Sequence, residues 1–196
     1  NHRLRWSQLR EFGLRYWTIV ALGAVFTLAR FSEAFLILRA QDSGIRIGLV
    51  PVVLIVMNIV YMLVAYPAGS ASDRGHPRSF LLAGLAALIA SDLVLAYAPT
   101  PEIVLAGAGI WGLHMALTQG TLSKLVADTA PDLYRGTAFG IFNLITGISA
   151  LFASLIAGAL WSAQGPQATF LGGAGFSALA ALGLLIYNAL HAPRPR

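Results

Sequence analysis

Four ionisable residues stand inside long apolar runs of this 196-residue sequence, namely Arg30, Glu33, Asp92 and His114. Ionisable groups are costly in hydrocarbon, so they usually face a cavity or a partner. Arg30 and Glu33 are three residues apart, and on a continuous helix they would share one face and could form an ion pair. These residues are therefore the first candidates for binding a polar ligand or for carrying a proton.

A second polar group follows a helical repeat. Trp111, His114, Thr118 and Thr121 are separated by three, four and three residues, which places them on one stripe of a helix. An imidazole can exchange a proton near neutral pH, and an indole can form an apolar or cation-binding wall. Core packing is the competing interpretation, in which His114 bonds to a neighbouring helix and Arg30 with Glu33 forms a static pair.

Two amides, Asn58 and Asn143, lie near the middle of further apolar runs. Each amide could line a cavity or join two helices, with an energy near about 1 kcal/mol. We include both residues in the candidate pathway for a substrate or a proton.

The composition defines the kind of scaffold that positions these residues. The chain is 57% hydrophobic and only 11% charged, whereas soluble domains carry about 25% charged residues. This balance predicts a multi-pass membrane protein with the lipid bilayer as a partner. The net charge of +5 does not indicate nucleic-acid binding, because the basic residues cluster at expected helix ends.

The sequence lacks the signatures of catalytic chemistry. It has no cysteine, no Walker-type phosphate loop, no nucleophile elbow and no His/Asp/Glu cluster at metal spacing. We therefore expect no enzyme, no cofactor and no metal site. The first residue is Asn, so we also expect the sequence to be part of a longer chain.

Six apolar runs approach or exceed the ~20 residues that cross about 30 Å of hydrocarbon. They predict an all-α bundle over residues 16–190, with helices at 16–38, 47–68, 79–98, 102–126, 136–161 and 168–190. A basic lead-in, residues 1–15, and a basic tail, residues 191–196, flank the bundle. The short turns suggest two three-helix units in inverted orientation, the last turn being the uncharged stretch 162–167.

Basic residues set the expected orientation. With six spans both termini share one side of the membrane, and that side is predicted to be cytoplasmic by the positive-inside rule. The opposite side holds only Arg39 and Arg46. The cytoplasmic side would carry Arg3, Arg5, Arg10, Arg15, Arg74, Arg78, Lys124, Arg135, Arg194 and Arg196.

A polar run between the second and third helices, residues 69–78, is predicted to form a tight cytoplasmic turn, with Pro67 marking the helix end before it. Gly69 permits close backbone approach, and Asp73 has a short carboxylate suited to capping a helix. Arg74 and Arg78 would stay with water and lipid headgroups.

This run resembles the loop signature of the major facilitator superfamily, Gly-x-x-x-Asp-Arg-x-Gly-Arg-basic, found between the second and third helices of each six-helix half. The residues in register are Gly69, Asp73, Arg74 and Arg78, while His76 and Pro77 depart from the pattern. Residues 134–143 are similar to the start of the eleventh helix of that family. The resemblance implies the carboxy-terminal half of a transporter, helices seven to twelve, with the amino-terminal half as its partner.

The resemblance implies secondary active transport of a small solute by alternating access, driven by protons, across a bacterial cytoplasmic membrane. In that family the loop carboxylate, here Asp73, sits against a helix of the other half, and the nearby arginine joins a charge network that locks one conformation. The alternative is that Asp73 only caps the third helix and the arginines only set topology.

The resemblance also implies that the first and fourth helices line a central cavity, so the two polar stripes would face each other across a substrate path. Glu33 is then the expected proton carrier, with His114 second, and Arg30 would hold Glu33 or bind an anionic group of a polar solute. Asp92 is expected to serve packing or an interhelical hydrogen bond, because the third helix is peripheral. A different class of function, a non-transporting membrane sensor or assembly module on the same scaffold, stays open.

Overall fold

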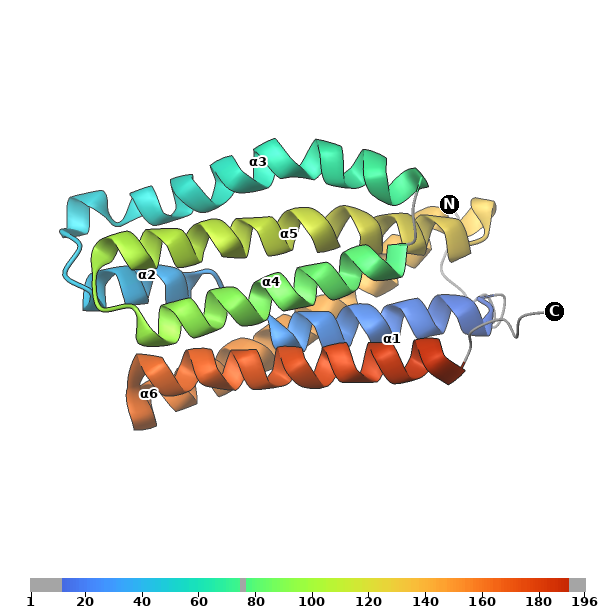
Figure 1. The fold of residues 1–196 in the computed structure, drawn as a ribbon. Helices are drawn as coiled ribbons and strands as arrows, with labels where there is room; N and C mark the ends of the chain where they lie inside the picture. Colours follow the sequence, from blue (N-terminus) through green and yellow to red (C-terminus); the bar gives the residue numbers. More distant parts are fainter. Residues whose placement is uncertain (1–11, 75–76, 191–196) are drawn as a thin grey trace.

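The protein is a bundle of long helices (Figure 1). The computed structural model describes residues 12–74 and 77–190, apart from the side chains of Asp73 and of residues 187–190. Most of the expected lead-in and all of the expected tail lie outside these residues. The elements are α1 (Leu14–Ala29), α2 (Ala34–Asp42), η2 (Ile47–Leu49), α3 (Pro51–Arg74), α4 (Pro77–Tyr97), α5 (Pro101–Thr129), η3 (Asp132–Tyr134) and α6 (Arg135–Leu190).

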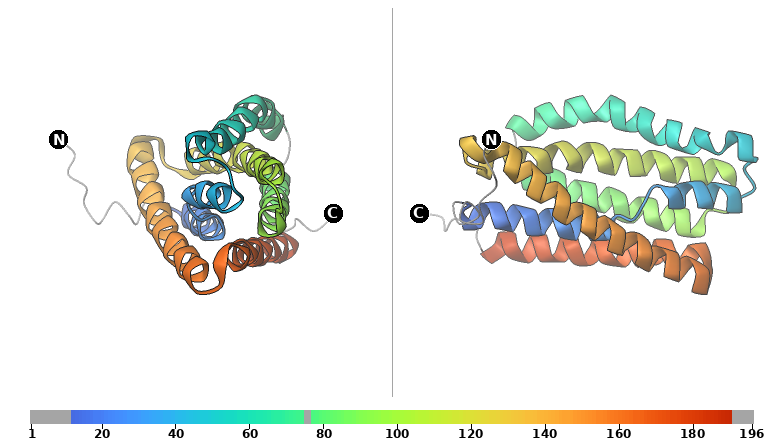
Figure 2. Two further views of the ribbon diagram at one scale, coloured as in Figure 1. Left: turned by 90° about the vertical axis from the view of Figure 1, so that its left-hand side faces the viewer. Right: turned by 180° about the vertical axis from the view of Figure 1, so that it is seen from behind.

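The long helices run side by side along one axis. Helix α5 packs against both α3 and α4, while α6 packs against α1 and α4. Viewed along the axis, α1 and α2 lie near the middle, between the first part of α6 on one side and α3, α4 and α5 on the other (Figure 2). One face of α1 and α2 is therefore buried against the rest of the bundle, while side chains such as Leu14, Val25 and Leu38 stay exposed.

Proline residues begin three of the long helices. Pro51, Pro77 and Pro101 are the first residues of α3, α4 and α5, where the missing N–H costs little and the fixed φ suits the helix. The second predicted helix was expected to begin at Ile47, but residues Ile47–Leu49 form a short 3₁₀ turn instead.

Helix α6 reverses direction within its length (Figure 1). Gly165 has φ 82° and ψ −175°, values outside the helical region, and Pro166 follows it. The positive φ favours glycine, so this residue separates two helical arms. Across the reversal the Thr169 hydroxyl donates to the carbonyl of Ala157 at 3.3 Å. The reversal lies within the predicted turn at residues 162–167.

The first predicted helix, residues 16–38, is wrong as a continuous element. Helix α1 ends at Ala29, Arg30 adopts an extended conformation with φ −115° and ψ 103°, and α2 begins only at Ala34. The Ser32 hydroxyl accepts a hydrogen bond from the Ala34 amide at 3.2 Å, which satisfies one donor at the new helix start. No proline or glycine marks the break, so tertiary contacts must stabilise it.

The turn between α3 and α4 is shorter than the predicted cytoplasmic turn at residues 69–78, so that prediction is wrong in its bounds. Helix α3 continues through Pro67 and Gly69 to Arg74, and α4 begins at Pro77. The buried Ser72 side chain lies 3.4 Å from the Thr121 hydroxyl of α5, a contact that holds the last turns of α3 against α5. Residues 75 and 76, which lie between the two helices, are outside the described part of the chain.

Five helical stretches of the described chain are long and apolar enough to cross a membrane, at Leu14–Asp42, Ile47–Ser72, Pro77–Tyr97, Pro101–Thr129 and Asp132–Ile186. The last stretch contains the reversal at Gly165. Many large apolar side chains on these helices are exposed, as expected for surfaces that face lipid or another membrane domain. The all-α membrane fold is confirmed, whereas six separate spans and their division into two repeats stay predictions.

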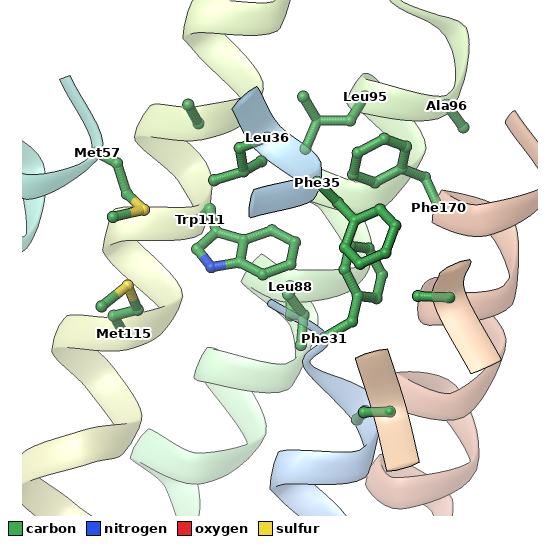
Figure 3. Close-up of a cluster of buried hydrophobic side chains, with 14 of the residues drawn as sticks. Phe31, Phe35, Leu36, Met57, Leu88, Leu95, Ala96, Trp111, Met115 and Phe170 are labelled. Carbon is green, nitrogen blue, oxygen red and sulfur yellow. The ribbon is translucent and has the colours of Figure 1, made fainter. Parts of the chain in front are cut away.

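Two groups of buried apolar residues hold the bundle together. The larger one surrounds the α1–α2 break, where the Phe31 ring lies 5.3 Å from Trp111 and 5.5 Å from Phe170 between centroids (Figure 3). The smaller one joins the start of α1 to the first arm of α6, where the Tyr16 hydroxyl donates to the Ala138 carbonyl at 2.9 Å. The larger core is the part that positions the candidate site.

Candidate functional site

A polar groove of about 410 Å³ lies between the α1–α2 break and the first arm of α6. It opens where the backbone leaves the helical path, near the middle of the first membrane stretch. Its lining combines charged, hydroxyl and apolar side chains: Thr27, Arg30, Phe31, Ser32, Glu33, Ala150, Leu151 and Ser154. Irregular backbone at membrane depth is tolerated where it is buried in protein or lines a cavity. The break is therefore tolerated because it lines the groove.

Arg30 and Glu33 both line this groove, and both are partly buried. The sequence predicts that they share one helix face and can pair. The shared face is wrong, because the break removes both residues from a common helix. Among the described residues neither side chain forms a hydrogen bond or a salt bridge. Their charges still attract each other across the groove. A guanidinium and a carboxylate that share one groove without a direct hydrogen bond can each bind a polar ligand.

The polar residues of the α5 stripe, His114, Thr118 and Thr121, do not line this groove. The His114 ring nitrogen Nδ1 lies 2.8 Å from the carbonyl oxygen of Gly84 in α4, and the imidazole is buried. The Thr118 hydroxyl donates to the His114 carbonyl at 2.8 Å. A Cβ at Gly84 would lie 2.3 Å from a Thr118 methyl carbon, so α4 and α5 are in close contact here.

The structure therefore does not bring the two stripes together around one hollow. The geometry of His114 and Thr118 agrees with the interpretation as core packing, since both side chains bond to backbone carbonyls. Trp111 is the link between the two regions, because its buried ring packs against Phe31 and so supports the inner wall of the groove.

The two candidate amides lie apart from the groove. Asn58 is exposed on α3, and its Nδ2 donates to the carbonyl of Leu54 one turn earlier at 2.8 Å. Asn143 is exposed on the first arm of α6. Neither amide joins two helices in the described part of the chain.

The residues of the predicted gate lie on both sides of the α3–α4 junction. Gly69 and Arg74 line a surface depression of about 520 Å³ on α3, together with Ala65, Tyr66 and Ser70. Arg78 is exposed in the first turn of α4. The side chain of Asp73 lies outside the described residues, so its expected role as a gate stays a prediction.

Sequence reasoning missed the role of Arg39. It was expected in a polar outer loop, yet it belongs to α2 and its side chain is buried. Its Nε and Nη2 donate to the carbonyls of Leu95 and Ala98 at 2.8 and 2.7 Å, and Nη1 contacts Asp42. The only signal in the sequence was the i,i+3 spacing of Arg39 and Asp42, which does not reveal the carbonyl partners.

The break, the groove and the membrane-length helices are typical of a multi-pass membrane transporter. Comparison with known proteins confirms this class. The chain belongs to the Major Facilitator Superfamily, because the sequence model of that family matches residues 14–196. The expected resemblance is thereby confirmed. This is a family of transporters and not of enzymes.

The chain is similar to an uncharacterized MFS-type transporter of Methanocaldococcus jannaschii, with 33% identity over 172 residues. The aligned region covers 85% of this chain but only 43% of the relative. This chain therefore spans less than half the length of that relative.

Proposed function

We propose that this chain is one six-helix half of a secondary active transporter that moves a small polar solute by alternating access. The observation that carries the proposal is the groove in which Arg30 and Glu33 lie, without a hydrogen bond or salt bridge to any described residue, inside a stretch long and apolar enough to span a membrane. Placing ionisable groups in hydrocarbon costs free energy. Their presence is explained if they bind a solute and a proton.

The half-transporter assignment rests on length and on helix order. If α1 and α2 together cross the membrane once and the arms of α6 cross it separately, the chain has six spans. The alignment to less than half of a longer transporter supports this division. The spans would then form two three-helix units, the first ending with α4 and the second beginning with α5, in inverted orientation. The amino-terminal half would be the partner across the groove.

In the proposed mechanism Glu33 carries the proton and Arg30 binds an anionic group of the solute. Transporter sites commonly form at interrupted helices near the middle of the bilayer, where free backbone groups and side chains meet. Here the interruption places Ser32 and Glu33 at the start of α2, beside Arg30. Protonating Glu33 would remove a negative charge that competes with the anion for Arg30. Releasing the proton on the other side would restore that competition and weaken the hold on the solute.

We assign the predicted gate motif to the same cycle. Gly69, Asp73, Arg74 and Arg78 would contact the amino-terminal half and stabilise one conformation. Because Arg74 and Arg78 lie at the end of the bundle where α3 joins α4, this end would be cytoplasmic under the positive-inside rule. The protein would reside in a cytoplasmic membrane, with both termini on the inner side.

The experiment is a coupling assay with the purified transporter in proteoliposomes that carry an internal pH-sensitive dye. Amino acids and small carboxylates are added one at a time under an imposed pH gradient. We expect the active solute to dissipate the gradient with the wild-type protein and not with Glu33→Gln, whereas solute exchange without a gradient should persist. Glu33→Gln removes only the charge, so exchange shows that the groove is intact.

The matched control is Glu102→Gln, because Glu102 is an exposed carboxylate in the first turn of α5 and far along the chain from the groove. Its gradient dissipation should equal that of the wild type. If Glu33→Gln also equals the wild type, Glu33 is not the coupling group. If no variant, including the wild type, moves any solute of the panel, the transport proposal itself loses support.

A further inference from the structure

Asp92 in α4 is completely buried, with 0% of its surface exposed. Both of its carboxylate oxygens lack a hydrogen-bond partner among the described residues. Of its two expected roles, packing or an interhelical hydrogen bond, the hydrogen bond is therefore not formed within the described part of the chain. An isolated ionised carboxylate in an apolar interior costs several kcal/mol even after relaxation, so its charge must be neutralised by a cation or by a proton.

The surroundings of Asp92 centre on Phe31 and Gly173. A Cβ on Gly173, in the second arm of α6, would lie 2.8 Å from Asp92 Oδ2 and 2.7 Å from a ring carbon of Phe31. The missing side chain of Gly173 therefore leaves the space in which the Asp92 carboxyl and the Phe31 ring meet. The break between α1 and α2 thus brings Phe31 against a buried acid.

Two further buried polar groups near this place have no partner. Trp111 Nε1 lacks a hydrogen bond within the described part of the chain, and its ring packs at a tilt against Phe31 (Figure 3). Ser177 Oγ also lacks one, and Ser177 is one helical turn after Gly173 on the second arm of α6. Buried polar atoms without a partner commonly bond to ordered water.

A small cavity adjoins Phe31 and Gly173, the two residues that border the Asp92 carboxyl. It has a volume of about 20 Å³ and is lined by Phe31 and Gly173 together with residues of α1 and of both arms of α6. A cavity of this size holds about one water molecule. Phe31 also lines the polar groove of Arg30 and Glu33. Its ring therefore stands between the groove on one side and Asp92 on the other.

Among the residues that the structure describes, no cation forms a salt bridge or hydrogen bond with Asp92. Arg30 and Glu33 lie in the groove on the other side of Phe31. The Arg39 guanidinium binds the carbonyls of Leu95 and Ala98, and the His114 ring binds the carbonyl of Gly84. The second arm of α6 carries no titratable residue from Pro166 to Ile186.

We propose that Asp92 is a buried proton-binding site, and that the Phe31 ring closes the path between this site and the groove. The carboxylate accepts one proton that enters from the groove, and the resulting neutral acid shares a water molecule in the small cavity. The proton exchanges with the groove only when Phe31 moves. This site is distinct from Glu33, and it does not depend on whether the protein transports a solute.

The first test is infrared spectroscopy of the protein in lipid nanodiscs at neutral pH. The wild type should show the carbonyl band of a protonated carboxylic acid, which Asp92→Asn removes and Asp128→Asn leaves unchanged, Asp128 being an exposed aspartate at the end of α5. Carboxyl-carbon NMR of wild-type protein labelled at aspartate tests the same point without a variant. At neutral pH one aspartate carboxyl signal should have the chemical shift of a protonated acid. A wild-type spectrum without a protonated aspartate would overturn the proposal.

The second test measures the path. On transfer to D₂O the band of the protonated acid should shift slowly in the wild type and several-fold faster in Phe31→Ala. Phe176→Ala is the matched control, because Phe176 lines the small cavity but not the groove. Equal exchange rates in the wild type and in Phe31→Ala would overturn the role of Phe31, and faster exchange in Phe176→Ala alone would move the path to the lipid side.

Discussion

At the scale of single residues, Arg39 is predicted from the sequence to be an exposed charge in an outer loop, but the structure buries its side chain. Its guanidinium binds two carbonyl oxygens near the C-terminal end of α4, those of Leu95 and Ala98. These carbonyls belong to the group that a helix end leaves without intrahelical partners, and a cation is favoured there by the helix dipole. Arg39 therefore fastens α2 to α4.

We expect Arg39→Gln to destabilise the protein, because hydrogen bonds that involve a charged donor contribute roughly 1.5–3 kcal/mol each. The change loses at least one of the two bonds to α4. Thermal unfolding in detergent, followed by intrinsic fluorescence, should show a lower midpoint. Arg46→Gln is the control, since Arg46 is exposed on the same end of the bundle and should have no effect beyond the error of the measurement. Equal midpoints for the two variants would show that the bonds of Arg39 contribute little.

The candidate site was predictable from the sequence in part. Arg30 and Glu33 stood out because a charged pair inside an apolar run is rare, and both residues do line the groove. Their mutual geometry was not predictable, since the i,i+3 argument assumes an unbroken helix. The orientation of His114 was not predictable either: a stripe of spacing three and four identifies a helix face, but it does not say which neighbour that face meets.

At the scale of elements, the contact between α3 and α5 depends on a glycine. A Cβ at Gly112 would lie only 2.2 Å from the backbone carbonyl oxygen of Met57, far inside van der Waals contact. Backbone atoms cannot rotate away as a side chain can, so the two helices would have to separate. This pair of helices is the most extensively packed in the bundle.

We therefore expect Gly112→Ala to destabilise the fold by about 1–3 kcal/mol, the usual range for overpacking. Gly120→Ala on the same helix should be neutral or stabilising, because nothing lies within 4 Å of that position and alanine favours a helix by about 1 kcal/mol over glycine. Thermal midpoints of the two variants should move in opposite directions. A decrease of similar size for both would mean that the glycines matter for a reason other than the contact.

The elements themselves were only partly predictable. Apolar runs located the helices well, and the reversal at Gly165 fell within the predicted turn because Gly-Pro is a strong local signal. The break after Ala29 carries no such signal, since it is stabilised by the packing of Phe31 against rings from α5 and α6. The polar run after Ala68 was expected to be a turn, but its small residues can remain helical when α5 offers contacts such as Thr121.

At the scale of the whole molecule, the basic residues are distributed unevenly between the two ends of the bundle axis. The end at which α1 begins and α3 meets α4 carries Arg15, Arg74 and Arg78, and the end of α5 adds Lys124 (Figure 1). The opposite end carries Arg39 and Arg46, of which Arg39 is buried and bound to α4. The asymmetry in exposed charge is therefore larger than the sequence alone indicates, which strengthens the argument that the first end is cytoplasmic.

The absence of cysteine in the sequence makes this orientation directly measurable. Between Gln41 at the end of α2 and Leu133 in η3 lie the three long helices α3, α4 and α5. If each of these helices crosses the membrane once, the odd number of crossings puts the two positions on opposite sides. Both side chains are exposed, so a cysteine at either position should be accessible from water.

We expect a membrane-impermeant thiol reagent to label Gln41→Cys in intact cells and Leu133→Cys only after the membrane is opened. Leu179→Cys, an exposed position on the second arm of α6, should stay unlabelled in both cases, because the reactive thiolate does not form in hydrocarbon. Labelling of both loop positions from one side would exclude three crossings between them. The reverse sidedness would keep the crossings but place the Arg74 end outside, and the gate residues could then not act at the inner face.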